Sequence, residues 1–138
     1  VSASTSRSIR QLLRLTVTHG TGGKAEVAGY WVGGKTGTAE KVGSRGYDQA
    51  KVLSSFVGVF PITDPRYLVF AMLDEPKGTS ATHGYATGGW TAAPVVRRVI
   101  ARIGPISGMA PVTSIASVDG SPTTVISLDG NEIHLAAY

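Results

Sequence analysis

Apolar residues recur at helical spacing near the start of the chain, which predicts a first helix from Ser2 to His19. The residues on its apolar side are Ile9, Leu12, Leu13 and Val17. Ser2 or Ser4 is suited to cap its N-terminus, and Gly20 stands where a left-handed C-terminal cap is favoured. The segment that follows, GTGGKAEVAG, is rich in turn residues and cannot continue the helix.

Three further segments have the composition of strands. Tyr30–Lys41 is predicted to be extended, although glycines interrupt it, and a loop is expected over residues 43–48. Lys51–Phe60 and Tyr67–Leu73 are rich in β-branched and aromatic residues. Only the short turn PITDPR joins these two segments, so they must pair as an antiparallel hairpin. Because both are apolar at successive positions, we expect each face of the sheet to be covered.

A second helix is predicted from Thr91 to Ile103, and it has an apolar stripe on one side. The residues of this stripe are Val95, Val96, Val99, Ile100 and Ile103. Pro94 is tolerated because it lies in the first turn of the helix. Gly104 and Pro105 are expected to end the helix, since proline cannot extend the backbone hydrogen bonds.

The composition suits one globular domain, because 42% of the 138 residues are hydrophobic and 16% are charged. There is no cysteine, which excludes a disulfide scaffold and a cysteine-ligated metal. His19, His83 and His134 have no paired-ligand spacing, so no metal site or other cofactor is predicted. Residues 105–138 are rich in Ser, Thr, Gly and Pro, and we expect a tail there with a small hairpin around residues 129–131.

The charge pattern changes this picture little. The formal net charge is +4, and Arg7, Arg10 and Arg14 fall on one side of the first helix, which we interpret as a solvated face. No interleaved aromatic residues are present to stack bases, so nucleic acid is not a predicted partner. No apolar run reaches the roughly 18 residues that are needed to cross a bilayer.

The stretch GYWVGGKTGTAEK, residues 29–41, fits two motifs with different chemistry. Its first eight residues fit G-x-x-x-x-G-K-[ST], the spacing of a phosphate-binding loop. The overlapping Lys35-Thr36-Gly37 fits the K-T-G element of serine enzymes that act on penicillins and cell-wall peptides. The first motif predicts a nucleotide-binding protein, and the second predicts an acyl-transfer site.

The surroundings of Lys35 favour the second motif. The apolar strand that ends in Asp74-Glu75 is similar to the Mg²⁺-holding strand of nucleotide-binding enzymes. A phosphate loop, however, requires its lysine to open a helix, and no helical apolar spacing follows Lys35. No crossover helix separates Lys35 from the strand that begins at Lys51, so these strands cannot be parallel neighbours. A phosphate-loop protein is retained as the minor alternative.

An extended K-T-G segment offers the groups that an acyl-transfer site needs. A strand beside a cleft can pair with a peptide-like substrate, and Gly37 removes a side chain where substrate backbone approaches. Lys35 supplies positive charge, and Thr36 and Thr38 supply hydroxyl donors for a carboxylate. A free N–H near Thr38 could face a tetrahedral oxyanion. Simple alternation places Lys35 opposite the two threonines, so the pattern leaves open whether all of them reach one cleft.

Together with K-T-G-T-A-E-K, two longer stretches resemble the second half of the transpeptidase domain of penicillin-binding proteins. These are TSRSIRQLLRLTVTHGTGGKAEVAG and GGWTAAPVVRRVI, and the resemblance covers residues 1–104. The form K-T-G-T-A-x-K is most similar to the monofunctional, class B, division-type enzymes. The resemblance implies an α+β fold, the C-terminal half of the serine β-lactamase/transpeptidase-like fold, with an antiparallel sheet flanked by helices.

The resemblance also implies a peptidoglycan D,D-transpeptidase that makes septal cell wall and binds β-lactams. In it, a serine attacks the D-Ala-D-Ala end of a stem peptide, and the acyl group passes to an amine of another strand. Carried over here, Lys35 orients and polarises the site, Thr36 and Thr38 hold the carboxylate of substrate or drug, and Gly37 belongs to the same substrate-binding segment. The N–H of Thr38 forms part of the oxyanion hole.

Two elements of the family pattern are missing from the chain. No serine has a lysine three positions later, and the only asparagine, Asn131, is preceded at two positions by Asp129, so neither S-x-x-K nor S-x-N is present. In the family's order both elements precede residue 1, and we expect the chain to be a fragment. Without a nucleophile it cannot form an acyl-enzyme, so the isolated chain is predicted to be inactive.

The expected partners follow from the resemblance. They are the peptidoglycan stem peptide, β-lactams, the N-terminal half of the same protein and cell-division proteins. A sheet without that N-terminal half exposes an edge and an apolar face, which predicts self-association. The parent protein is expected to face the periplasm from an anchor in the inner membrane. A non-enzymatic β-lactam sensor of the same fold is the alternative.

Overall fold

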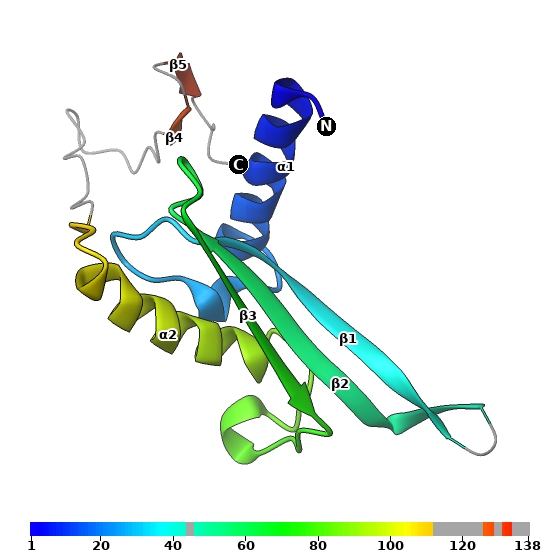
Figure 1. Ribbon diagram of the computed structural model, residues 1–138. Helices are drawn as coiled ribbons and strands as arrows, with labels where there is room; N and C mark the ends of the chain where they lie inside the picture. Colours follow the sequence, from blue (N-terminus) through cyan, green and yellow to red (C-terminus); the bar gives the residue numbers. More distant parts are fainter. Residues whose placement is uncertain (44–45, 112–125, 129–130, 134–138) are drawn as a thin grey trace.

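The computed structural model describes residues 1–43, 46–111, 126–128 and 131–133. Its main elements, shown in Figure 1, are α1 (Ala3–Thr18), β1 (Gly33–Gly43), β2 (Gly46–Phe60), β3 (Tyr67–Asp74) and α2 (Ala92–Ile106). The smaller elements are the single turns η1 (Gly23–Ala25) and η2 (Ser80–Thr82) and the strands β4 (Ile126–Leu128) and β5 (Asn131–Ile133). Within these described residues, no helix is both long and apolar enough to cross a bilayer.

The three longer strands form an antiparallel sheet in the order β1-β2-β3. The predicted hairpin of the second and third strands is confirmed, with Phe60 opposite Tyr67. The loop expected over residues 43–48 is wrong, because β1 and β2 stay paired as far as Gly43 and Gly46. Pairing along the ladder overrides the local glycine-rich composition. The β1–β2 hairpin consequently extends beyond the end of β3 (Figure 1).

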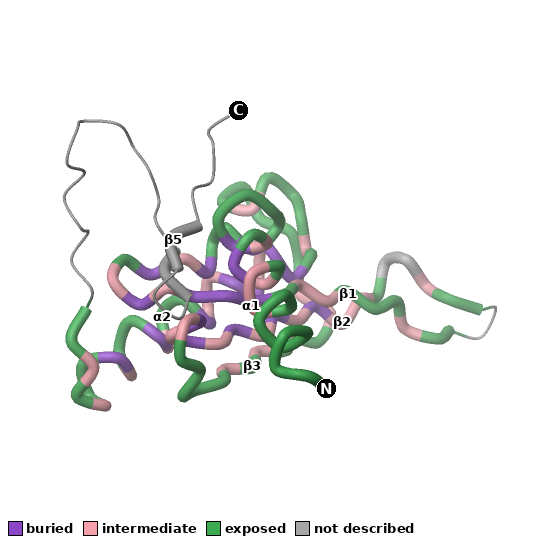
Figure 2. The backbone as a smooth tube through the Cα atoms, turned by 90° about the horizontal axis from the view of Figure 1, so that it is seen from above, coloured by how far each residue is buried: buried purple, intermediate pink, exposed green. Residues whose placement is uncertain are grey.

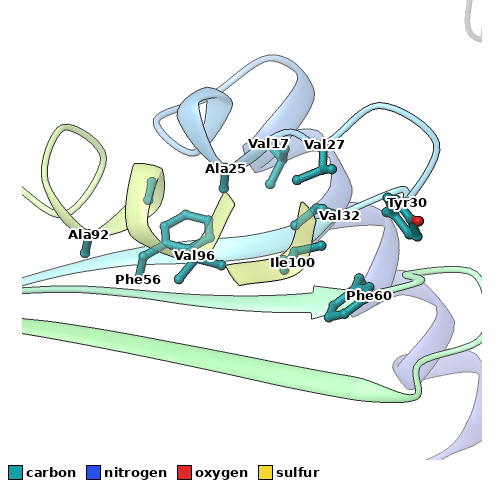
Figure 3. Close-up of a cluster of buried hydrophobic side chains, with 11 residues drawn as sticks. Val17, Ala25, Val27, Tyr30, Val32, Phe56, Phe60, Ala92, Val96 and Ile100 are labelled. Atoms are coloured by element: carbon teal, nitrogen blue, oxygen red, sulfur yellow. The ribbon is translucent and has the colours of Figure 1, made fainter. Parts of the chain in front are cut away.

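One face of the sheet carries the hydrophobic core. Phe56 and Phe60 of β2 lie fully buried beneath α2, whose Val96 and Ile100 are also fully buried (Figure 3). Val17 at the end of α1 joins the same cluster. Both helices therefore pack on one face, and the predicted stripe of the second helix is confirmed as buried at Val96 and Ile100.

The opposite face of the sheet is apolar and exposed. Leu68, Phe70 and Met72 of β3 point to this face and remain 65%, 58% and 60% exposed. They lie opposite half-buried β2 residues such as Val57 and Val59. The expectation that an incomplete sheet exposes an apolar face is confirmed. The helices among the described residues do not cover this face.

The first helix begins and ends close to where the sequence predicts. Ser2 caps it, because its side chain accepts a hydrogen bond from the N–H of Thr5 at 3.1 Å. The left-handed cap at Gly20 is wrong. The C-cap is His19, which has a negative φ and donates its N–H to the carbonyl of Leu15.

The apolar side predicted for α1 is only partly correct. Val17 is buried, whereas Ile9 and Leu12 are exposed. Only the C-terminal half of the helix reaches the core, and the exposed N-terminal half projects from the domain (Figure 2). Helical spacing indicates which residues share a side, but it does not say how far that side is covered.

The solvated arginine face expected on α1 is wrong. Arg14 is buried and makes a bidentate ion pair with Glu26, in which Nη2 donates to Oε1 at 3.0 Å. Its Nη1 also donates to the carbonyl of Val32 at 2.7 Å. Arg10 is half-buried and donates to the carbonyl of Thr63 at 2.7 Å. These contacts attach α1 to the segment before β1 and to the segment after β2, which lie at the same end of this antiparallel pair.

The second helix starts after its N-cap Thr91 as predicted, but it continues to Ile106 through Gly104 and Pro105. Gly104 serves packing and does not end the helix, because a Cβ there would lie 2.3 Å from the ring of Tyr30. The hairpin expected in the tail is confirmed as a pair, β4 with β5. The two residues between these strands lie outside the described part.

Candidate active site

The K-T-G segment lies in a strand, as the acyl-transfer interpretation requires. Residues 35–38 run along β1, so Lys35 does not open a helix and the phosphate-loop alternative is wrong. The strand starts later than predicted, since Gly29 and Trp31 have φ values of 83° and 46° and turn the chain. Extended backbone begins at Gly33.

The strand register places the side chains of residues 35–38 alternately on the two faces of the sheet. Thr36 and Thr38 lie opposite Phe56 and Ser54 on the face that the helices cover. Lys35 belongs to the other face. Its ammonium nevertheless folds back along the strand, because Nζ donates to the carbonyl of Thr36 at 2.9 Å and to its Oγ1 at 3.2 Å. The Lys35 ammonium and the Thr36 hydroxyl therefore lie together, although their side chains start on opposite faces of the strand.

The Lys35 ammonium and the Thr36 hydroxyl meet at the edge of β1 that points away from β2. The hydroxyl of Ser55 on β2 donates to the carbonyl of Gly37 at 3.4 Å, which places that carbonyl on the β2 side. Successive residues of an antiparallel strand alternate in direction, so the backbone groups of Thr36 and Thr38 point to the other edge. No strand pairs with that edge in the described part of the chain. The N–H of Thr38 is therefore directed toward a vacant strand position.

Gly37 of the K-T-G segment lies next to Ser55 of β2. A Cβ on Gly37 would lie 2.5 Å from Oγ of Ser55, the end of a short rotatable side chain. This neighbour lies across the sheet and not along the free edge. Because that hydroxyl can rotate away, the contact does not by itself require glycine, and the role of Gly37 in admitting the substrate backbone stays a prediction.

A Gly-Gly loop fixes the inner side of the strand. The N–H of Gly88 donates to Oγ1 of Thr38 at 3.3 Å. A Cβ on Gly88 would lie 2.1 Å from the carbonyl oxygen of Ser55, so only glycine allows this approach. Next to it, the buried Ser54 hydroxyl lies 2.6 Å from that of Thr91, the N-cap of α2. The start of α2 is thereby tied to the strands that carry the K-T-G segment.

Sequence reasoning missed a neighbour of Thr36. Oγ1 of Thr21, in the turn after α1, lies 3.1 Å from Oγ1 of Thr36. The same turn is held by Lys24, whose Nζ lies 4.0 Å above the ring of Trp90. The Trp90 ring also stacks on Tyr85 and meets His83 in a T-shaped contact, and both of these residues are exposed. A contact between two hydroxyls fifteen residues apart leaves no signal in a linear pattern.

The far end of the K-T-G strand is held by an ion cluster. Lys41 contacts the carboxylate of Asp74 and donates to Oε1 of Glu75 at 3.0 Å, bridging β1 to the end of β3. The hydrogen bond to Asp74, followed by that to Glu75, raises the pKa of Lys41 above its usual value of 10.5. Across the described residues, His, Asp and Glu side chains form no group that could hold a metal ion.

These features define a class of α+β domains. In this class the K-T-G segment lies on an edge strand, next to a Gly-Gly loop that leads into the final helix. The family model of the penicillin binding protein transpeptidase domain matches residues 1–101. The chain therefore belongs to that family.

Curated relatives agree with this assignment. The chain is 43% identical over 131 residues to the "Probable peptidoglycan D,D-transpeptidase FtsI" of Caulobacter vibrioides, covering 88% of the chain and 22% of the relative. It is 41% identical over 111 residues to "Stage V sporulation protein D" of Bacillus subtilis, covering 80% of the chain and 16% of the relative. The chain thus spans about a fifth of the length of these relatives.

Solved structures show the same fold. The apo transpeptidase domain of penicillin-binding protein 3 from Burkholderia pseudomallei aligns with a TM-score of 0.70 at 38% identity, covering 82% of this chain and 33% of that one. Penicillin-binding protein 3 from Mycobacterium tuberculosis, complexed with ampicillin, aligns with a TM-score of 0.71 at 28% identity, covering 85% and 27%.

Proposed function

We propose that this chain is the C-terminal part of a septal peptidoglycan D,D-transpeptidase that β-lactams acylate. The observation that carries the proposal is the free edge of β1, where the Lys35 ammonium and the Thr36 hydroxyl meet. A stem peptide ending in D-Ala-D-Ala adds along this edge as a further strand, and its carboxylate accepts from the hydroxyls of Thr36 and Thr38. A relative named as a D,D-transpeptidase, and a β-lactam complex of a structural neighbour, support this assignment.

In the proposed reaction, the rest of the protein supplies the serine nucleophile, and this chain supplies the groups that stabilise the developing charge. A serine oxygen bonds to the carbonyl carbon of the penultimate D-Ala, the amide bond to the last D-Ala breaks, and the departing amine takes a proton. An amine of a second stem peptide then attacks the ester and restores the serine. The N–H of Thr38 stabilises the oxyanion of both tetrahedral intermediates, and Lys35 contributes positive charge.

The partners and the location belong to the same proposal. The exposed Leu68, Phe70 and Met72 face is covered by the N-terminal half of the protein, which brings the serine to β1. The parent protein works outside the cytoplasm, anchored in the inner membrane, and assembles with cell-division proteins. The proposed transpeptidase part comprises residues 1–104 and the proposed tail residues 105–138, although α2 itself continues to Ile106.

Covalent labelling with a fluorescent penicillin tests the proposal. The isolated 138-residue chain is expected to give no labelled band, because it contains no S-x-x-K serine. The full-length protein that carries this segment is expected to give one. Lys35→Ala should weaken the band at least tenfold, whereas Lys51→Ala, an exposed lysine on β2, should leave it unchanged. An unlabelled full-length protein would overturn the transpeptidase assignment. A labelled isolated chain would show that the chain itself contains a nucleophile, contrary to the prediction.

A further inference from the structure

We propose that Thr21 is a positioning residue, which orients the hydroxyl of Thr36 so that it donates its proton to the carboxylate of the substrate. This inference rests on the proposed function, since it concerns the same carboxylate. Thr21 lies outside the K-T-G segment, in the turn that follows α1. The observation that carries it is the 3.1 Å contact between the two Oγ1 atoms.

Hydrogen-bond accounting at Thr36 explains why a neighbour is needed. A hydroxyl has one proton to donate and two lone pairs that accept. The ammonium of Lys35 can only donate, so it occupies one lone pair of Thr36 at 3.2 Å. Thr21 either donates to the second lone pair or accepts the proton of Thr36. Only the first arrangement leaves that proton for a ligand.

An anionic ligand selects that arrangement. A carboxylate has no proton to give, so Thr36 must donate to it and Thr21 must then donate to Thr36. The result is a chain of donors from Thr21 through Thr36 to the carboxylate, in which each bond polarises the next. The hydroxyl of Thr38 is arranged in a similar way, because it accepts a hydrogen bond from the N–H of Gly88 at 3.3 Å.

The backbone around Thr21 is built to keep its hydroxyl in place. The N–H of Gly22 donates to the carbonyl of Thr16 at 2.9 Å, which closes the turn. A Cβ on Gly89 would lie 2.4 Å from the carbonyl oxygen of Thr21, so the Gly-Gly loop packs directly on it. Lys24 above Trp90 joins the same two segments a few residues away. Thr21 is therefore held by the loop that also holds Thr38.

The test is carried out on the full-length protein with a matched pair of ligands. These are benzylpenicillin, which has a free carboxylate, and its methyl ester, which lacks the negative charge. The second-order rate constant of acylation is measured for both, and their ratio reports recognition of the carboxylate. Thr21→Val, which has nearly the same shape, is expected to lower the acid-to-ester ratio about fivefold through the loss of one hydrogen bond. Thr21→Ser keeps the donor and should retain the ratio within about twofold of wild type.

The internal comparison separates positioning from a folding defect. A misfolded variant loses both rate constants together, so equal losses for acid and ester in Thr21→Val would overturn the proposal. Thr18→Val is the matched control, because Thr18 is an exposed threonine whose hydroxyl donates to the carbonyl of Arg14. It should leave the ratio unchanged. A wild-type protein that reacts with neither ligand would instead contradict the proposed function.

Discussion

At the scale of single residues, Gly104 allows two opposing effects to be compared. Alanine in place of a helical glycine usually stabilises a helix by up to about 1 kcal/mol. Here its Cβ would lie 2.3 Å from the ring of Tyr30, which is buried and donates from its hydroxyl to the carbonyl of Met109 at 3.3 Å. The ring cannot move away without losing that bond, and overpacking of a core costs about 1 to 3 kcal/mol.

Gly104→Ala is therefore expected to destabilise the chain by about 1 to 2 kcal/mol, measured as a lower urea midpoint at unchanged slope. The control is the same change combined with Tyr30→Leu, which removes the ring. In that background Gly104→Ala should be neutral or stabilising. A destabilisation of equal size in both backgrounds would mean that the contact with Tyr30 is not its cause.

Residues also differ in how much the sequence reveals about them. The K-T-G pattern predicts where Lys35 and Thr36 lie in a strand, and the structure confirms that placement. Their chemical roles stay predictions. Thr21 was missed, because its contact with Thr36 depends on how a turn packs in three dimensions. The burial of Arg14 could not be predicted, since a charge pattern does not show that the Glu26 carboxylate and the Val32 carbonyl lie within hydrogen-bonding distance of it.

At the scale of elements, the K-T-G strand depends on its neighbours at both ends. Lys41, near the far end of β1, forms ion pairs with Asp74 and Glu75 at the end of β3, and these ion pairs link the two outer strands of the sheet. Because the pKa of Lys41 is raised in the folded chain, the stabilisation is complete below its ordinary value of 10.5. It is lost as the pH rises through the raised value.

Replacing Lys41 tests this coupling. As the pH rises from 10.5 through the raised pKa of Lys41, wild type should lose more stability than Lys41→Met does, because the variant has no ammonium to lose. Lys41→Arg is the control, since a guanidinium stays protonated in this range and should keep its share of stability. Urea midpoints measured at several pH values report the difference between variants. Parallel pH profiles for wild type and Lys41→Met would show that the ion cluster does not contribute.

Elements were predicted best where a pattern was long and local. The positions of both helices and of the β2–β3 hairpin are predicted correctly, since each has a clear local pattern of apolar residues. The composition of Gly43–Asp48 predicts a loop, yet β1 and β2 stay paired as far as Gly43 and Gly46. The end of α2 was placed too early for a related reason. Gly104 and Pro105 break helices in isolation, but packing against Tyr30 carries the last turn past them.

At the scale of the whole molecule, the sheet has one face that the helices cover and one face that the described residues leave exposed. The helices bury one face of the sheet, whereas Leu68, Phe70 and Met72 leave an apolar patch on the other. An exposed apolar face of this kind favours association with a second surface. In the full-length protein we assign that surface to the N-terminal half, and in the isolated chain it must be a second copy.

Light scattering of the isolated chain tests this directly. The wild-type chain is expected to show at least twice its monomer mass at tens of micromolar, because burial of several apolar side chains gains a few kcal/mol. Replacing Leu68, Phe70 and Met72 by threonine keeps their preference for strands and should shift the mass to that of a monomer. The control replaces the exposed α1 residues Ile9, Leu12 and Leu15 by glutamine, which retains helix propensity and should leave association unchanged. If the helix variant became monomeric and the sheet variant did not, the sheet face would not be the surface through which this part of the protein meets its missing half.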